Sequence, residues 1–188
     1  MKEKKELIQG ILEIELEMFL SVKAKGNPSC QQDPKSFKVH RGAQFQVWSE
    51  RTLQSYLGDL EKARDEGVNL MTLKYARMEG IIPQRNANPL IDDIAGLQYT
   101  WQKEMFAKYP RMMAGARDLS SGDDTEYRTS FETYLKGELE TYSDETLASL
   151  HADMLEKKKK GINMSEEVYQ ILVRQYGYNS IDEVETGN

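Results

Sequence analysis

The feature that most constrains this chain is a helical spacing of apolar residues that returns along most of its length. Within residues 4–23, for example, apolar side chains recur at intervals of three and four, which is typical of one face of an α-helix. No alternating run bounded by turn residues indicates a strand, and no repeat with a period of 20–50 residues stands out. We therefore expect an all-α fold, a single-domain helical bundle of six to eight helices of mixed length.

Capping and turn residues divide this pattern into segments. Asp33 and Asn88 each combine an N-cap side chain with a proline at the next position, and Gly67 and Gly161 are typical stops after a helix. The expected helical segments are residues 4–23, residues 34–66 with a break near Ser49, residues 70–79, a helix after Asn88, a short piece over 112–119, residues 125–141, residues 144–159, residues 166–176 with Ser165 as its cap, and a last turn after Ser180.

Length and charge exclude several classes of protein. The 188 residues fit one domain, and the Ser-, Gly- and Asp-rich residues 120–124 are the place for a division into two parts. A net charge of −6 argues against a nucleic-acid-binding surface, and no apolar run is long enough to predict a membrane span. The single cysteine excludes an intrachain disulfide, and the charged start lacks a signal-peptide pattern, so we expect a cytoplasmic protein.

Two glutamates fall on apolar helix faces. Each helical residue advances about 100° around the axis, so Glu15 lies about 80° from Leu7, inside the apolar stripe, while Glu13 and Glu17 lie on the opposite side. In the segment 125–141, Glu138 lies about 20° from Tyr127 and therefore also points inward, whereas Glu140 does not. A buried carboxylate without a partner is costly, so each of the two inward glutamates needs one.

Arg41 is the candidate partner for these carboxylates. Phe37, Arg41, Gln44 and Trp48 share one helix face, and an inward arginine must meet a carboxylate or a ligand anion because it cannot lose its charge. The same charge argues against a Mg²⁺ or Mn²⁺ site built from Glu15 and Glu138, because the arginine would compete for their oxygens. We therefore expect no metal site, with a Mg²⁺ or Mn²⁺ site at Glu15 and Glu138 as the less favoured alternative, and the cofactor is left open.

Two functions from different classes follow from these residues. In the first, the chain is an enzyme or binding protein for a small polar or anionic molecule in a pocket between helices. Arg41 would bind the anionic group, Glu15 or Glu138 would act as a catalytic acid or base, and the pocket would be lined by Gln44, Trp48, Trp101 and Tyr142. In the second, the chain is a non-catalytic structural or adaptor protein, and the Glu–Arg network fixes the packing of its helices. A homodimer is left open by both.

Cys30 is a further catalytic candidate. It precedes a helix start, where the thiolate is favoured, but the nearby Asp33 opposes that effect. A catalytic thiol also needs a base, and neither histidine is close in sequence. An incidental or buried thiol is the alternative.

Several blocks of the chain resemble a bacterial family catalogued as a domain of unknown function, number 4125. The blocks are residues 14–19, 29–37, 44–48, 74–78 and 134–143. The resemblance implies a helical bacterial protein and covers nearly the whole chain. It implies no activity, so no catalytic role is transferred to Glu15, Cys30, Arg41 or Glu138.

Overall fold

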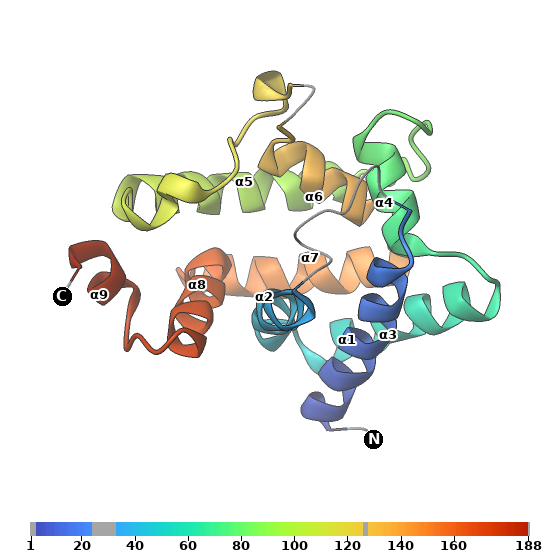
Figure 1. Cartoon of the computed structure of the whole chain (residues 1–188), viewed down its shortest axis with the longest axis horizontal. Coiled ribbons are helices and arrows are strands. Elements are labelled where there is room, and N and C mark those ends of the chain that lie inside the picture. The colour runs from blue at the N-terminus through green and yellow to red at the C-terminus, as the bar shows by residue number, and fades with distance from the viewer. Residues whose placement is uncertain (1–2, 24–32, 126–127, 188) are drawn as a thin grey trace.

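The computed structural model describes residues 3–23, 33–125 and 128–187, and these residues form helices and no strand (Figure 1). This confirms the all-α expectation: eight of the nine α-helices in the described ranges have at least nine residues, and α9 has six. The elements are α1 (Lys4–Leu20), α2 (Pro34–Gln46), α3 (Glu50–Asp65), α4 (Leu70–Met78), α5 (Leu90–Lys108), the 3₁₀ turns Met112–Gly115 and Ser121–Asp123, α6 (Phe131–Leu139), α7 (Asp144–Lys159), α8 (Met164–Gln175) and α9 (Ile181–Thr186).

The N-cap residues decide where most of these helices begin. Ser49 accepts a hydrogen bond from the backbone of Thr52, so the expected break after residue 48 is present and separates α2 from α3. The expected helix over residues 125–141 was placed too early, because Ser130 is the cap and α6 starts at Phe131. Ser165 is not the cap of α8, because Asn163 caps that helix two residues earlier.

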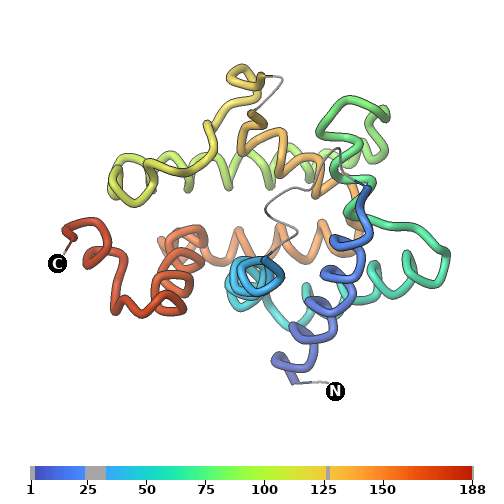
Figure 2. The backbone as a smooth tube through the Cα atoms, viewed as in Figure 1, coloured from blue at the N-terminus to red at the C-terminus, as the bar shows by residue number. Residues whose placement is uncertain are grey.

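The contacts between helices divide α1–α8 into two sets of four that pack against each other. Figures 1 and 2 show α5 and α7 of the second set as two long helices, one above the other, with α2 of the first set in front of α7. In the first set α1 contacts α2, α3 and α4, and in the second set α5 contacts α6, α7 and α8. Between the sets α3 packs on α7, α2 on α8, and α4 on α6. Each set is therefore arranged around one long helix, and the two sets share a single interior.

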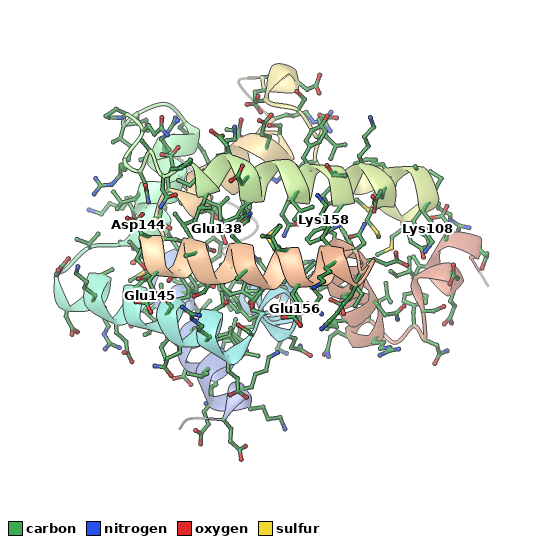
Figure 3. All side chains as sticks on the ribbon, turned by 180° about the vertical axis from the view of Figure 1, so that it is seen from behind. Lys108, Glu138, Asp144, Glu145, Glu156 and Lys158 are labelled. Atoms are coloured by element: carbon green, nitrogen blue, oxygen red, sulfur yellow. The ribbon has the colours of Figure 1, made fainter. Side chains whose placement is uncertain are left out.

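The main apolar core lies along these contacts and includes Ile11, Phe45, Leu53, Ile94 and Leu147, all completely buried. A smaller apolar cluster joins the end of α5 to α8 and α9. The charged ends of the helices lie at the surface: Figure 3 shows α7 from behind, with Asp144 and Glu145 in its first turn and Lys158 near its end, as the helix dipole favours.

No helix in the described residues combines the length and apolar character needed to cross a membrane.

Candidate functional site

The first helix carries a glutamate into the interior. Glu15 is completely buried, whereas Glu13 and Glu17 on the same helix are exposed, as the helical spacing predicts. The reason is that α1 packs on three other helices with one apolar face, and Glu15 lies within that face. Its carboxylate therefore has to find all its partners inside the protein.

Arg41 of α2 binds both inward glutamates. Its Nε donates to Oε2 of Glu15 at 2.9 Å, and its Nη2 donates to Oε1 of Glu15 at 2.5 Å. The two bonds form a bidentate ion pair. Its Nη1 donates to Oε1 of Glu138 on α6 at 2.9 Å. The same Nη1 donates to Oε1 of Gln44 at 2.8 Å, and the guanidinium lies 4.8 Å from the centre of the Phe45 ring.

Lys74 completes the ionic part of the site, and the sequence analysis missed it. Its Nζ donates to Oε2 of Glu138 at 2.5 Å and lies 3.6 Å from the centre of the Tyr134 ring. Only 2% of Lys74 is exposed, because it shares the inward face of α4 with Leu70 and Met71. Helical spacing could have identified it, since Leu70 and Lys74 are four residues apart.

Two tyrosine hydroxyls donate further hydrogen bonds to the carboxylates of Glu15 and Glu138. Tyr56 of α3 donates to Oε1 of Glu15 at 2.6 Å, and Tyr142 donates to Oε1 of Glu138 at 2.6 Å. Tyr142 was expected near the site, whereas Tyr56 was not. Glu15, Arg41, Lys74, Glu138, Tyr56 and Tyr142 are called the charge cluster below.

The charge cluster is electrically balanced, with two carboxylates and two cations. Burial opposes the charge of Arg41, but the carboxylates of Glu138 and Glu15 outweigh it and raise the pKa of the guanidinium well above its usual value. Burial likewise opposes ionisation of Glu138, but Arg41 and Lys74 outweigh it and lower the pKa of that carboxyl far below 4.5. Burial, together with the nearby carboxylates, raises the pKa of the Tyr56 and Tyr142 hydroxyls well above 10.0.

All four carboxylate oxygens of the charge cluster accept a hydrogen bond from a described residue. Glu138 is a poor proton acceptor in this arrangement, because Arg41 and Lys74 stabilise its ionised form. The geometry therefore suits a structural ion-pair network better than a catalytic acid or base.

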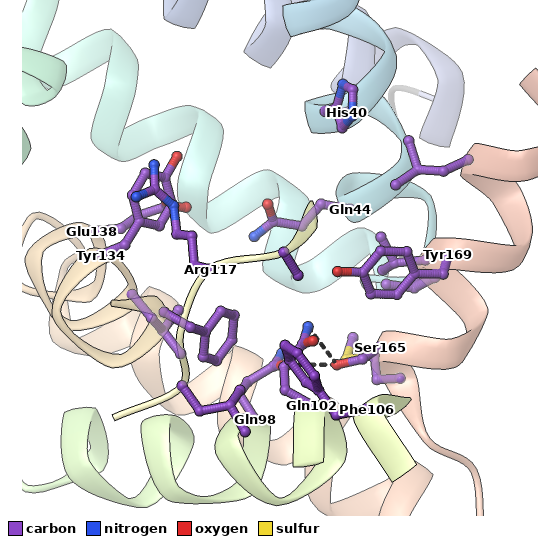
Figure 4. A pocket seen from close by; sticks show the side chains of 18 of the residues that line it. His40, Gln44, Gln98, Gln102, Phe106, Arg117, Tyr134, Glu138, Ser165 and Tyr169 are labelled. Atoms are coloured by element: carbon purple, nitrogen blue, oxygen red, sulfur yellow. Dashed lines mark hydrogen bonds between the residues drawn. The ribbon is translucent and has the colours of Figure 1, made fainter. Parts of the chain in front are cut away.

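A cavity of about 620 Å³ lies directly beside the charge cluster, between α2, α5, α6 and α8. Glu138 and Gln44 bond to Arg41 of the charge cluster and also line the cavity, and Trp48 lines it as well. Figure 4 shows Gln44 entering from α2 on one side and Gln98 and Gln102 from α5 on the other. Most of the remaining wall is apolar, including Phe106 of α5.

Polar side chains on one wall of the cavity bond to one another. Ser165 of α8 donates to Oε1 of Gln98 at 3.1 Å, and Nε2 of Gln102 lies 3.5 Å from the Ser165 hydroxyl (Figure 4). Burial raises the pKa of the Tyr169 hydroxyl, and a hydrogen bond with Gln102 partly opposes this increase. Ser165, expected only as a helix cap, is thus part of the cavity wall.

The other predicted residues are not all in one place. Trp48 and Tyr142 lie close together, with ring centres 6.2 Å apart. Trp101 is buried but lines a different hollow, between α5 and the end of α7, together with His151. Cys30 and Tyr127 lie outside the described residues.

The expectation that Glu140 points outward was wrong. Only 7% of Glu140 is exposed, and its carboxylate accepts two hydrogen bonds from Nε of Arg77, at 3.1 Å and 2.8 Å. Glu140 keeps helical backbone angles (φ −63°, ψ −15°), but Arg77 of α4 and the backbone of Arg85 cover the side of the chain to which it points, and the apolar stripe of α6 does not indicate this.

The described parts of the chain contain no group of three or more His, Cys, Asp or Glu side chains that could hold a metal ion.

Fold and site together define an all-helical protein with a buried, balanced charge cluster and an adjoining cavity. Over residues 5–186 the chain matches the family described as "Protein of unknown function (DUF4125)", and it belongs to that family. No curated protein matches it, and no solved structure does either.

Proposed function

We propose that this protein binds a small organic molecule in the cavity between α2, α5, α6 and α8, and that the charge cluster is the rigid wall beside it. The observation that carries the proposal is the cavity itself, with a volume of about 620 Å³. Ligand pockets for small molecules commonly have volumes of about 300–1,000 Å³, with apolar walls and a few polar groups.

The lining supports this reading. Phe106, Leu135 and Val168 supply apolar surface, while the amides of Gln44 and Gln98 supply polar groups that could fix the orientation of a ligand. Pockets between helices are a common place for ligands in helical bundles.

Under this proposal Glu15, Arg41 and Glu138 position the cavity wall instead of reacting with the ligand. Arg41 is already engaged by two carboxylates, so an anionic ligand would have to displace a buried ion pair to reach it. Gln44, like Glu138, contacts Arg41 and also lines the cavity, but it is uncharged and belongs to no ion pair.

A fluorescent probe tests the proposal. The wild type should enhance the fluorescence of 8-anilinonaphthalene-1-sulfonate with a saturable profile, because the probe gains an apolar environment in the cavity. The variant Val168→Phe narrows the cavity from the α8 side and should weaken probe binding. Leu155→Phe is a matched control, since Leu155 is 46% exposed on α7 and does not line this cavity. Equal probe binding by all three proteins would refute the proposal.

A second function, as a structural or adaptor protein, is favoured by the complete pairing of the charge cluster. Such a protein needs a rigid interior and no ligand. It predicts that the probe does not bind, while removal of one charge from the cluster still strongly destabilises the fold.

A further inference from the structure

Two segments of the chain carry the same pattern of helix-capping, core and turn residues. Each shared residue of the second segment lies 94 positions after its counterpart in the first segment. The shared residues are Ser49, Thr52, Leu53, Ser55, Asp59, Gly67 and Asn69 in the first segment, and Ser143, Thr146, Leu147, Ser149, Asp153, Gly161 and Asn163 in the second. This period is too long for a short-repeat protein and indicates two copies of a larger unit.

The hydrogen bonds of the two segments mirror each other. Asp153 of α7 accepts from the backbone of Ser49 at 2.8 Å and from the hydroxyl of Thr52 at 2.7 Å, at the start of α3. In return, Asp59 of α3 accepts from the backbone of Ser143 at 3.0 Å and from the hydroxyl of Thr146 at 2.7 Å, at the start of α7. Each of these helices thus supplies a carboxylate to the start of the other.

The glycines that end α3 and α7 also correspond. Gly67 and Gly161 have φ values of 70° and 69°, in the left-handed region that glycine adopts without strain. The next backbone amides, of Val68 and Ile162, donate to carbonyls of their own helices at 2.8 Å and 2.9 Å.

Helix packing follows the same exchange. The exchange matches α1, α2, α3 and α4 with α5, α6, α7 and α8, in that order. The contacts of α1 with α2, α3 and α4 then match the contacts of α5 with α6, α7 and α8, and the α2–α8 contact matches the α6–α4 contact. The α3–α7 contact maps onto itself. The two sets of helices are therefore related by an approximate twofold exchange, as two copies of one unit would be.

A pair of asparagines aligns the first helix of each copy. Nδ2 of Asn69 donates to the carbonyl of Met18 in α1 at 2.8 Å, and Nδ2 of Asn163 donates to the carbonyl of Trp101 in α5 at 3.1 Å. Glu15 lies three residues before Met18, and Gln98 lies three residues before Trp101. Gln98 is therefore the counterpart of Glu15, 83 positions later instead of 94, because the stretch between the first and second helix is 11 residues longer in the second copy.

We infer that the chain is an internal duplication of a four-helix unit and that the cavity is the second copy of the charge-cluster site. Its walls show this, because the counterparts of six residues in and around the cluster all line the cavity. Gln98 and Leu135 are the counterparts of Glu15 and Arg41. Val168 and Gln44 are the counterparts of Lys74 and Glu138. His40 and Trp48 are the counterparts of Tyr134 and Tyr142.

The differences between the two sites explain why one is filled and the other is open. Leu135 and Val168 are shorter than Arg41 and Lys74, so the space that the two cations fill in one copy is left as a cavity in the other. Amides replace the two carboxylates, so the positions equivalent to Glu15 and Glu138 carry no charge in the open copy.

The amides also define the class of ligand, and this step rests on the proposed function. Arginine has no acceptor, so the Gln44 group bonded to Arg41 must be its oxygen, and its Nε2 is left as a donor. Gln98 uses its oxygen to accept from Ser165, which leaves its Nε2 as a second donor. Neither Nε2 group has a protein acceptor within the described parts of the chain, and both side chains line the cavity. The ligand is therefore a molecule with an apolar body and an oxygen acceptor, such as a carboxylate or a carboxamide.

Rebuilding the ion pair in the open copy tests the duplication. Leu135→Arg alone places a third cation beside Glu138, whose charge Arg41 and Lys74 already balance, and should lower the urea midpoint. Adding Gln98→Glu should restore much of this loss, because Arg41 and Glu15 are an ion pair in the other copy. In the control, Leu155→Arg adds an exposed arginine to Gln98→Glu. It should not recover the stability that Gln98→Glu alone loses.

The outcomes are distinct even if a single variant fails to fold. A double variant that recovers the helical circular dichroism or the urea midpoint lost in Leu135→Arg supports equivalent sites. A double variant that loses at least the sum of the two single losses overturns the inference.

Three probes of equal chain length test the ligand class. Octanoate and octanamide should raise the melting temperature of the wild type, whereas octylammonium, which offers no acceptor, should not. The double variant Leu135→Arg with Gln98→Glu should lose the response. An equal response to octylammonium contradicts the ligand class. If no probe shifts melting although the ion pair is recovered, the proposed function fails and the duplication stands.

Discussion

Arg41 and Glu138 are 97 residues apart in the sequence, yet Nη1 of the arginine donates to Oε1 of the glutamate at 2.9 Å in the interior. This bond joins α2 of one set of helices to α6 of the other. The same guanidinium binds both oxygens of Glu15 on α1, so one side chain connects three helices. Any change at this position should therefore affect the packing of both sets.

The ion pair of Glu15 and Arg41 can be tested with a double-mutant cycle. Glu15→Gln leaves Arg41 without one of its counter-charges, and Arg41→Met leaves a buried carboxylate. Each single change should cost about 3–5 kcal/mol in the free energy of unfolding, because removal of one member strands the other in the interior. The double variant should cost much less than the sum, because residues in contact are not additive. Urea unfolding of the four proteins gives all the values.

Glu13→Gln serves as the control for this cycle, since Glu13 is exposed on the same helix and should change stability little. Additive, small effects of Glu15→Gln and Arg41→Met would contradict the buried pair.

The stability of the protein should depend on the ionisation of Glu138 at acid pH. Arg41 and Lys74 lower its folded-state pKa below the ordinary 4.5, against the effect of burial. A depressed carboxyl pKa stabilises the fold above the unfolded-state pKa, and this contribution disappears as the pH falls through about 4.5 and below. Glu138→Gln should therefore be less stable at about pH 7 and should lose less stability between about pH 7 and pH 3 than the wild type. Parallel pH profiles for the two proteins, measured by urea unfolding, would contradict this role.

Gly137 allows α6 to approach α4 closely, next to Lys74. A Cβ atom at this position would lie 2.8 Å from Cγ of Met78 and 3.3 Å from the backbone oxygen of Lys74. Gly137→Ala should therefore destabilise the protein by about 1–3 kcal/mol, through a forced shift of the two helices. Gly58→Ala on α3 is the matched control, because no atom lies within 4 Å of its added Cβ and it should stabilise by about 0.5–1 kcal/mol. Thermal or urea unfolding distinguishes the two, and a stabilising Gly137→Ala would count against the close approach.

Asp59 and Asp153 should have equal effects if the two helical units are copies. Each accepts a backbone and a hydroxyl hydrogen bond at the start of the opposite helix. Asp59→Ala and Asp153→Ala should each cost about 0.5–2 kcal/mol, the usual range for loss of a helix-capping interaction. A large cost for one and none for the other, measured by urea unfolding, would show that the mirrored bonds are not equivalent.

Helical spacing predicted the inward direction of three residues of the charge cluster, Glu15, Arg41 and Glu138. Glu15 and Arg41 lie in the middle of their helices, so an angle counted from neighbouring apolar residues identified the inward side. The prediction for Glu140 was wrong because Arg77 and the backbone of Arg85 cover it from a side that carries no apolar stripe. Lys74 was not predicted, because lysine is rarely buried and the residue type gives no signal, although its spacing from Leu70 indicates the inward face of α4.

The duplication was missed for a different reason. Its period of 94 residues is well outside the 20–50 residues typical of repeat proteins, and the copies share mainly capping, core and turn positions. The site residues themselves differ, with Leu135 in place of Arg41 and Val168 in place of Lys74. Only the mirrored contacts of α3 and α7 made the correspondence visible.

The sequence by itself determined the helical class, most helix starts and the inward direction of Glu15, Arg41 and Glu138, because these depend on local capping and on helical spacing. The tertiary structure alone decided which charges meet, that Lys74 and Tyr56 join them, and that a cavity opens where Leu135 and Val168 stand. These features depend on how helices distant in sequence pack against one another, and no local pattern specifies that packing.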